Sequence, residues 1–160
     1  MAAKRRLTIE RTYAATLDEI WALWSTKDGI ESWWGPVGFG ITVQSMDLKA
    51  GGKLVYIMAP TAPDTLAFMK SSGMPIEVEC KLTFTEVEAP RRLAYTTLTD
   101  FIPGVQAYEV ETLLELEAAG GQVRMLLTFD AMHDDEWTGR MQEGRESELG
   151  KLDALLALRA

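Results

Sequence analysis

The chain of 160 residues has few of the side chains that most often build metal and nucleophilic sites. It contains one cysteine, Cys80, and one histidine, His133. A lone cysteine excludes an internal disulfide and is typical of proteins from a reducing compartment. Zinc sites usually need several Cys or His ligands, so we expect no metal site. We also expect no cofactor, because the chain has no glycine-rich phosphate loop; Gly51 and Gly52 instead mark a hairpin turn.

Positive charge and long apolar runs are also scarce. The chain has 16 Lys and Arg against 24 Asp and Glu, which gives a net charge of −8. This balance argues against nucleic acid and anionic membrane as partners, because both attract basic surfaces. No apolar run is long enough for a signal peptide or a transmembrane helix. We therefore expect a soluble, cytoplasmic protein with one domain over residues 1–160.

Hydrophobic periodicity predicts a strand, two helices, six strands and a long helix. Alternation of apolar and polar residues predicts strands over residues 7–13, 40–48, 53–59, 76–88, 92–99, 106–117 and 122–130. Helical spacing predicts helices over residues 16–25, 27–34 and 134–160. Thr16 and Glu19 have the spacing of a capping box at the first helix. The order predicts an α+β fold, with a seven-stranded, mostly antiparallel sheet covered on one face by the C-terminal helix.

Two adjacent tryptophans, Trp33 and Trp34, end the second predicted helix, and Gly35 and Pro36 follow as a stop signal. Adjacent residues of a regular element cannot both point the same way. We expect one ring to pack beneath the two helices with the other tryptophans there. The other ring should lean over a cavity near Phe39, although core packing alone would also explain the pair.

Four segments together resemble a known family over about residues 7–158. They are TLDEIWALWSTKDGIESWWGPVGF (16–39), MDLKAGGKLVYIM (46–58), EVEAPRRLAY (86–95) and a last helix with the pattern W…G…SEL…L…LL. These segments resemble the START-like (SRPBCC) superfamily. Within it, the chain is similar to single-domain bacterial-type members of the heat-shock-protein-90 ATPase activator homologue family.

This resemblance implies a helix-grip fold, in which a curved seven-stranded antiparallel sheet wraps around the long C-terminal helix and two short helices follow the first strand. It also implies a hydrophobic cavity between the sheet and the long helix. Relatives bind lipids, sterols, polyketides or plant hormones, and a few are cyclases. Eukaryotic co-chaperone members stimulate a heat-shock ATPase. That role places the domain behind a separate N-terminal domain, for which 160 residues leave no room.

Arg145 departs from the family pattern, because many members carry an aromatic residue after the helix glycine, here Gly144. Arg145 lies at helical spacing with three leucines, so its side chain starts on the face turned to the sheet. Three interpretations stay open for its charge. It can pair with an internal carboxylate such as Glu109 or Glu111, reach the rim of the sheet, or hold a ligand carboxylate or phosphate in the cavity.

The segment PTAPDTLAFMKSSGMP (60–75) is a second departure, because a short hairpin is expected there. We predict a short helix capped near Asp64 and ended at Gly73. The segment could be a lid over the cavity mouth, a packed insertion or a contact in a homodimer.

Other polar candidates are weak. His133 lies near several aspartates and could act as a general base or metal ligand, but those acids also suit a helix N-terminus. Cys80 lies on the apolar face of its predicted strand, as a small buried hydrophobe would. We therefore assign no catalytic residue.

The leading hypothesis is that the cavity binds a small hydrophobic molecule, with an acidic end met by Arg145. We expect a volume of several hundred Å³, as is usual for such pockets. A cyclase- or hydrolase-type enzyme, a protein-partner module like the co-chaperones, and a filled core without ligand are the alternatives. The predicted cavity residues are Trp34, Phe39, Tyr56, Met58, Tyr95, Tyr108, Val110, Met141 and Arg145.

Overall fold

The computed structural model describes residues 5–35, 37–73, 75–100 and 102–157, and it confirms the predicted order of elements. Pro36 of the predicted stop signal lies outside the described residues. The strands are β1 (Arg6–Tyr13), β2 (Phe39–Met46), β3 (Lys53–Pro60), β4 (Val78–Glu88), β5 (Arg92–Thr99), β6 (Tyr108–Ala119) and β7 (Gln122–Asp130). The helices are α1 (Leu17–Ser25), α2 (Lys27–Trp33), α3 (Pro63–Ser71) and α4 (Asp135–Ala157).

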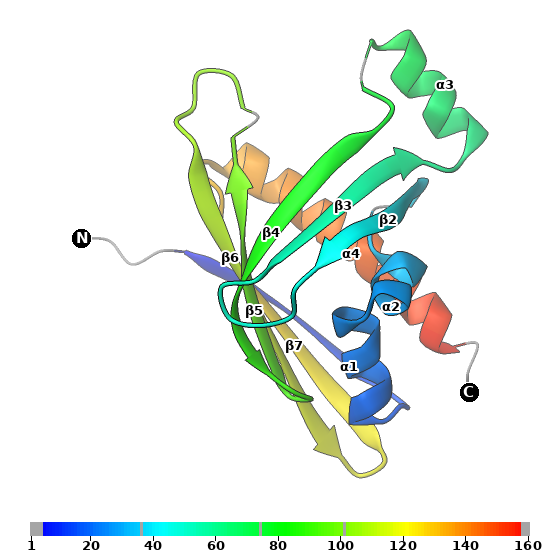
Figure 1. Ribbon diagram of the computed structural model, residues 1–160, viewed down its shortest axis with the longest axis vertical. Coiled ribbons are helices and arrows are strands. Elements are labelled where there is room, and N and C mark those ends of the chain that lie inside the picture. The colour runs from blue at the N-terminus through cyan, green and yellow to red at the C-terminus, as the bar shows by residue number, and fades with distance from the viewer. Residues whose placement is uncertain (1–4, 36, 74, 101, 158–160) are drawn as a thin grey trace.

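The seven strands form one antiparallel sheet in the order β1-β7-β6-β5-β4-β3-β2. The sheet is curved, and the long helix α4 crosses one of its faces (Figure 1). Helices α1 and α2 lie at one end of this arrangement, and α3 projects beside the far ends of β3 and β4 (Figure 1). The predicted helix-grip fold is therefore correct. None of the described helices combines the length and apolar character needed to cross a membrane.

Local capping explains the two short helices after β1. Thr16 accepts a hydrogen bond from the Glu19 backbone N–H, and the Glu19 side chain accepts one from the Thr16 N–H, so the predicted capping box is present. Thr26 ends α1 and also caps α2, because its hydroxyl accepts a hydrogen bond from the Gly29 N–H. The two helices therefore follow each other without a linker.

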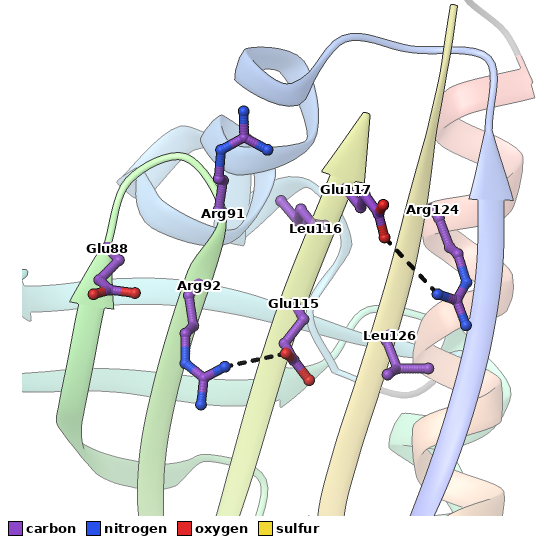
Figure 2. Close-up of a pocket in the computed structure, with 8 residues that line it drawn as sticks. All are labelled: Glu88, Arg91, Arg92, Glu115, Leu116, Glu117, Arg124 and Leu126. Atoms are coloured by element: carbon purple, nitrogen blue, oxygen red, sulfur yellow. Dashed lines mark hydrogen bonds and ion pairs between the residues drawn. The ribbon is translucent and has the colours of Figure 1, made fainter. Parts of the chain in front are cut away.

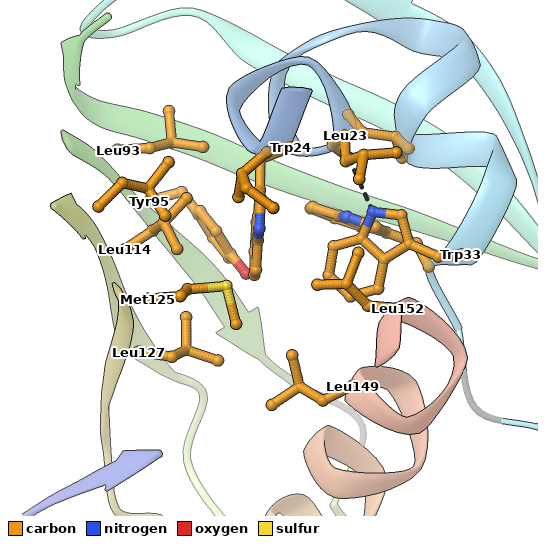
Figure 3. Close-up of a cluster of buried hydrophobic side chains, with 14 of the residues drawn as sticks. Leu23, Trp24, Trp33, Leu93, Tyr95, Leu114, Met125, Leu127, Leu149 and Leu152 are labelled. Carbon is orange, nitrogen blue, oxygen red and sulfur yellow. Dashed lines mark hydrogen bonds between the residues drawn. The ribbon is translucent and has the colours of Figure 1, made fainter. Parts of the chain in front are cut away.

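The core lies between the inner face of the sheet and α1, α2 and α4 (Figure 3). The alternation predicted for β6 and β7 is present, since every second residue of the central part of each strand is buried. Side chains from the helices complete the core. The largest fully buried helix residues are Ile20, Trp24, Ile30, Trp33 and Leu149.

Two local predictions were wrong. Asp64 does not cap α3; the N-cap is Ala62, which makes no side-chain hydrogen bond, and Pro63 at the first position supplies the preset backbone angle instead. The buried face predicted over residues 76–88 covers only part of that segment, because Ile76 and Val78 are exposed. This end of β4 lies beside α3, at the periphery of the molecule (Figure 1).

Candidate functional site

A hollow of about 210 Å³ lies between α4 and the inner face of the sheet. It is smaller than the several hundred Å³ expected, because large aromatic and charged side chains occupy the space. Three neighbouring strands, the end of α2 and one face of α4 contribute to it. The lining residues are Trp34, Tyr56, Leu82, Tyr95, Thr97, Met141, Gly144, Arg145 and Glu148.

Helix α4 presents four residues to the hollow at positions i, i+3, i+4 and i+7. They are Met141, Gly144, Arg145 and Glu148. Residues at these intervals share one face of a helix. Leu149 and Leu152, further along α4, are buried in the core. Their packing therefore fixes the position of the four residues that line the hollow.

The Arg145 guanidinium is bonded to two neutral hydroxyl groups from the sheet. Nη1 donates to Tyr95 Oη at 3.1 Å, and Nη2 donates to Thr112 Oγ1. The guanidinium carbon lies 5.0 Å from the centre of the Phe129 ring. Burial alone would lower the pKa of Arg145, but Tyr95 and Glu148 more than offset this effect, so the pKa is raised and the side chain stays charged.

Glu148 brings a negative charge into the same hollow. Its Oε2 atom accepts a hydrogen bond of 2.8 Å from the backbone N–H of Gly35. Burial raises the pKa of this carboxyl above its ordinary value, although Arg145, the Gly35 N–H and Lys151 each act in the opposite direction. Ionised Glu148 is thus disfavoured by its surroundings in spite of two nearby cations.

Two other titratable side chains beside the hollow are held in their neutral forms. Burial raises the pKa of Tyr56 well above its ordinary value, and Cys80, Glu148 and Tyr95 add to the effect. Burial likewise raises the pKa of Cys80, which is the cross-strand neighbour of Tyr56. A raised pKa removes thiolate character, so Cys80 lacks the property that makes a cysteine reactive.

Both tryptophans of the pair are buried in the core, and Trp34 also lines the hollow, whereas Phe39, near which one ring was expected, does not. Trp33 is 1% exposed, packs edge-on against Trp24 at 4.8 Å between ring centroids, and donates its indole N–H to the Leu23 carbonyl (Figure 3). Trp34 lines the hollow, with its ring centroid 5.7 Å from that of Tyr56. Helix α2 ends at Trp33, and Trp34 has an extended backbone, so the two adjacent side chains start from different backbone conformations.

The turn after Trp34 is bound to α4 through its backbone. Besides the Gly35–Glu148 bond, the Val37 N–H donates to Ser147 Oγ at 3.0 Å. The Lys151 ammonium donates to the carbonyls of Trp34, Gly35 and Phe39 at 3.2, 3.1 and 3.1 Å. Polar groups of α4 therefore satisfy a turn that would otherwise leave backbone donors and acceptors unpaired.

Five of the nine predicted cavity residues line the hollow, and four do not. The residues brought together are Trp34, Tyr56, Tyr95, Met141 and Arg145. Phe39, at the start of β2, and Met58, near the end of β3, are partly buried. Val110 is 3% exposed and fills the core. Tyr108 points elsewhere, because its hydroxyl lies 2.8 Å from His133 Nδ1.

The internal partners predicted for Arg145 were wrong. Glu109 and Glu111 alternate along β6 with the buried residues Val110 and Thr112, so their side chains lie on the outer face. Glu111 pairs there with Arg6 at 2.7 Å. The hydroxyl of Thr112, one residue further along β6, is the one that meets the guanidinium.

Four lining residues were not predicted: Leu82, Thr97, Gly144 and Glu148. Glu148 could have been found from the sequence, because it lies three residues after Arg145 and seven after Met141 on the predicted helix. Thr97 follows Tyr95 at strand spacing and could have been found in the same way. Leu82 could not have been found from the sequence, because its position at the hollow depends on the pairing of β4 with β5.

The lone histidine lies outside the hollow, where β7 passes into α4. His133 Nε2 is 3.3 Å from Asp134 Oδ2, and Asp134 also accepts the Trp137 N–H as a helix cap. Within the described ranges, no three His, Cys, Asp or Glu side chains are grouped so that they could hold a metal ion. No residue of α3 lines the hollow, so the lid interpretation of residues 60–75 gains no support from the geometry.

A second hollow, of about 330 Å³, lies on the outer face of the sheet (Figure 2). Two of its three arginines have acidic partners: Arg92 is 3.1 Å from Glu115, and Arg124 is 3.9 Å from Glu117. These partly exposed pairs form a solvated, self-neutralised surface. The hollow beside α4 is the better candidate. Arg145 is partly buried there and forms no ion pair with a carboxylate among the described residues, whereas Arg91, the third arginine of the outer hollow, is exposed.

Comparison with solved structures supports the fold. A protein from Silicibacter pomeroyi described as AHSA1 superimposes with a TM-score of 0.74 at 24% identity, over 98% of this chain and 100% of the other. A protein from Arthrobacter aurescens gives a TM-score of 0.75 at 23% identity, over 95% and 86% of the two chains. An AHSA1-like protein from Aeromonas hydrophila gives 0.65 at 20% identity, over 94% of each chain.

At these identities the structures establish the fold and leave the activity open. A search among curated proteins gives no match to this chain. The sequence profile of one family matches residues 14–157, which includes every element from α1 to α4 and all the residues that line the hollow. The chain therefore belongs to the family described as Activator of Hsp90 ATPase homolog 1-like protein.

Proposed function

We propose that the protein binds a small hydrophobic molecule with an acidic group in the hollow between the sheet and α4. The apolar part of the ligand would contact Trp34, Leu82 and Met141, and the acidic group would be met by Arg145. This arrangement matches the usual composition of small-molecule sites, in which a few polar groups orient a ligand against apolar walls.

The position of Arg145 carries this proposal. Among the described residues, its hydrogen-bond partners are the hydroxyls of Tyr95 and Thr112, and it forms no ion pair with a carboxylate. A guanidinium has five N–H donors in a fixed plane that suits a carboxylate. Donors beyond those used by the two hydroxyls are thus available at the hollow, where solvent screening is weaker than at the surface.

The volume of the hollow limits the size of the ligand. An apolar protein cavity of about 150 Å³ is large enough to bind benzene. A hollow of about 210 Å³ therefore suits an acid with one ring or a short branched chain. It is too small for a sterol or a long-chain lipid unless the walls move.

A thermal-shift measurement tests the proposal. Phenylacetate and 3-methylbutanoate would be compared with the corresponding neutral amides, on the wild type and on Arg145→Met. A ligand at about a hundred times its Kd adds about 2.7 kcal/mol of stability, which corresponds to a rise of about 5–10 °C at this chain length. We expect the acids to stabilise the wild type and not the variant.

Arg140→Met is the matched control, because Arg140 lies on the exposed side of α4 and pairs with Glu136. This variant should respond to the acids as the wild type does. The proposal is wrong if the acids and amides act alike, or if Arg145→Met folds normally and still responds to the acids.

Catalysis of the cyclase or hydrolase type is a second candidate, and Glu148 favours it. A carboxyl with a raised pKa beside a cation in a hollow is a common feature of active sites. The test is whether a ligand found by the screen is recovered unchanged after prolonged incubation, as monitored by NMR. Conversion that depends on Glu148 would favour an enzyme, and unchanged ligand would favour simple binding.

A further inference from the structure

The hollow contains a second charged group that any acidic ligand must accommodate. Glu148 lies three residues after Arg145 on the same face of α4, and both side chains line the hollow. Residues at this spacing have Cβ atoms about 5–6 Å apart. A carboxylate bound to Arg145 would therefore lie close to the Glu148 carboxylate.

Glu148 retains an unused acceptor. Its Oε2 atom is bonded to the Gly35 N–H, and none of the described residues donates a hydrogen bond to Oε1. The groups that affect the pKa of Glu148 are Arg145 and Lys151 from α4 and the Gly35 N–H, and Glu148 in turn raises the pKa values of Tyr56 from β3 and Cys80 from β4. The Lys151 ammonium is directed to three backbone carbonyls, and Tyr56 and Cys80 are neutral.

Two carboxylates in one partly desolvated site repel each other unless a proton or a hydrogen-bond donor lies between them. A ligand can supply that donor itself. We infer that the preferred ligands are small hydrophobic acids with a hydroxyl or amino group next to the carboxylate, so that Arg145 holds the acid and Glu148 accepts the donor. This inference rests on the proposed function and specifies its ligand class.

A simple acid should bind by a different route, because it brings no donor. Its binding would require Glu148 to take up a proton. Burial already raises the pKa of Glu148, and a second carboxylate would raise it further. The affinity for a simple acid should therefore fall as the pH rises above the pKa of Glu148 in the free protein, whereas the affinity for a 2-hydroxy acid should fall less.

The test uses two probes that differ by one hydroxyl group, 3-methylbutanoate and 2-hydroxy-3-methylbutanoate, the latter as separate enantiomers. Their Kd values would be measured by NMR titration at pH 5.5 and 8 on the wild type, Glu148→Gln, Arg145→Met and Glu143→Gln. Glutamine can still accept the Gly35 N–H bond, so the fold should be kept. Glu143 is an exposed residue of α4 that does not line the hollow and serves as the matched control.

At pH 8 we expect one enantiomer of the hydroxy acid to bind the wild type and Glu143→Gln about tenfold or more tighter than the simple acid, as for a hydrogen bond to a charged group. In Glu148→Gln this preference should fall to about threefold or less, and the simple acid should bind more tightly than to the wild type. Both acids should lose affinity in Arg145→Met.

Two results would overturn the inference, and they are distinguishable. If the simple acid binds through Arg145 but the hydroxyl gives no preference, or a preference that Glu148→Gln leaves unchanged, only the ligand class is wrong. If neither acid binds the wild type, the proposed function fails as well.

Discussion

Arg145 and Glu148 line the same hollow from neighbouring turns of α4, yet within the described residues their charged atoms do not approach to the 4.0 Å of an ion pair. Each is held by other groups: Arg145 by two hydroxyls of the sheet, and Glu148 by the backbone of Gly35. The charges interact across the hollow, because each affects the pKa of the other. Under the proposed function, a ligand would lie between these two side chains.

Replacing the charge of Glu148 should stabilise the protein at high pH. A carboxyl whose pKa is raised on folding favours the folded state fully only below its unfolded pKa, and that contribution is lost as the pH rises through the folded pKa. Glu148→Gln removes the ionisation. We therefore expect the variant to be more stable than the wild type at pH 8, with the difference shrinking as the pH falls toward about 4.

Urea unfolding between pH 4 and pH 8 measures this difference. Glu143→Gln is the control, because Glu143 is exposed. A difference between wild type and Glu148→Gln that stays constant with pH would contradict the prediction.

Removing Arg145 should destabilise the protein, and this loss of stability should be larger at high pH. Arg145 favours the ionised form of Glu148, so its loss raises the pKa of Glu148 further. Arg145→Met also leaves two sheet hydroxyls without their donor, at a cost of about 1–3 kcal/mol. We expect the variant to lose more stability at pH 8 than at pH 5.

The double variant Arg145→Met/Glu148→Gln should lose this pH dependence, because the titrating group is gone. Urea unfolding of the four proteins at both pH values forms a double-mutant cycle. Additive effects at pH 8 would show that the two charges are not coupled.

A side chain at Gly144 should fill the hollow without disturbing the fold. A Cβ atom added there meets no other heavy atom within 4 Å. Leucine is a better helix former than glycine by about 1 kcal/mol, so Gly144→Leu should be at least as stable as the wild type. Its branched side chain should lower the affinity for the acids described above by about tenfold or more.

Gly150→Leu provides the matched control. Gly150 is an exposed residue of the same helix, and an added Cβ is equally unhindered, but the residue does not line the hollow. Calorimetric titration of both variants checks the prediction, which is wrong if Gly144→Leu binds as Gly150→Leu does.

The two most buried tryptophan rings of the helix pair should differ in their response to truncation. Trp33 donates its indole N–H to the Leu23 carbonyl at 2.8 Å, whereas the buried Trp24 N–H has no acceptor among the residues that the structure describes. Phenylalanine removes the N–H at either position and leaves a smaller ring. We expect Trp33→Phe to cost about 1 kcal/mol more than Trp24→Phe, because only Trp33 loses a hydrogen bond.

Guanidinium unfolding of the two variants tests this comparison. Equal losses of stability, or a larger loss in Trp24→Phe, would show that ring volume outweighs the hydrogen bond at these positions.

The sequence by itself determined the elements and most of what a single element can fix. The capping box of Thr16 and Glu19, the alternation along β6 and β7 and the inward side of Arg145 all follow from spacings within one helix or strand. The same spacing also places Glu148 beside Arg145. Such features depend on neighbours up to about seven residues away, which the sequence displays directly.

Only the tertiary structure decided which groups meet across elements. The hydroxyls on Arg145 come from residues 50 and 33 positions away along the chain, and the Gly35 N–H reaches Glu148 across 113. These pairs depend on the curvature of the sheet and on how far α4 lies across it. Both are set by the packing of the whole core, so no local pattern in the sequence contains them.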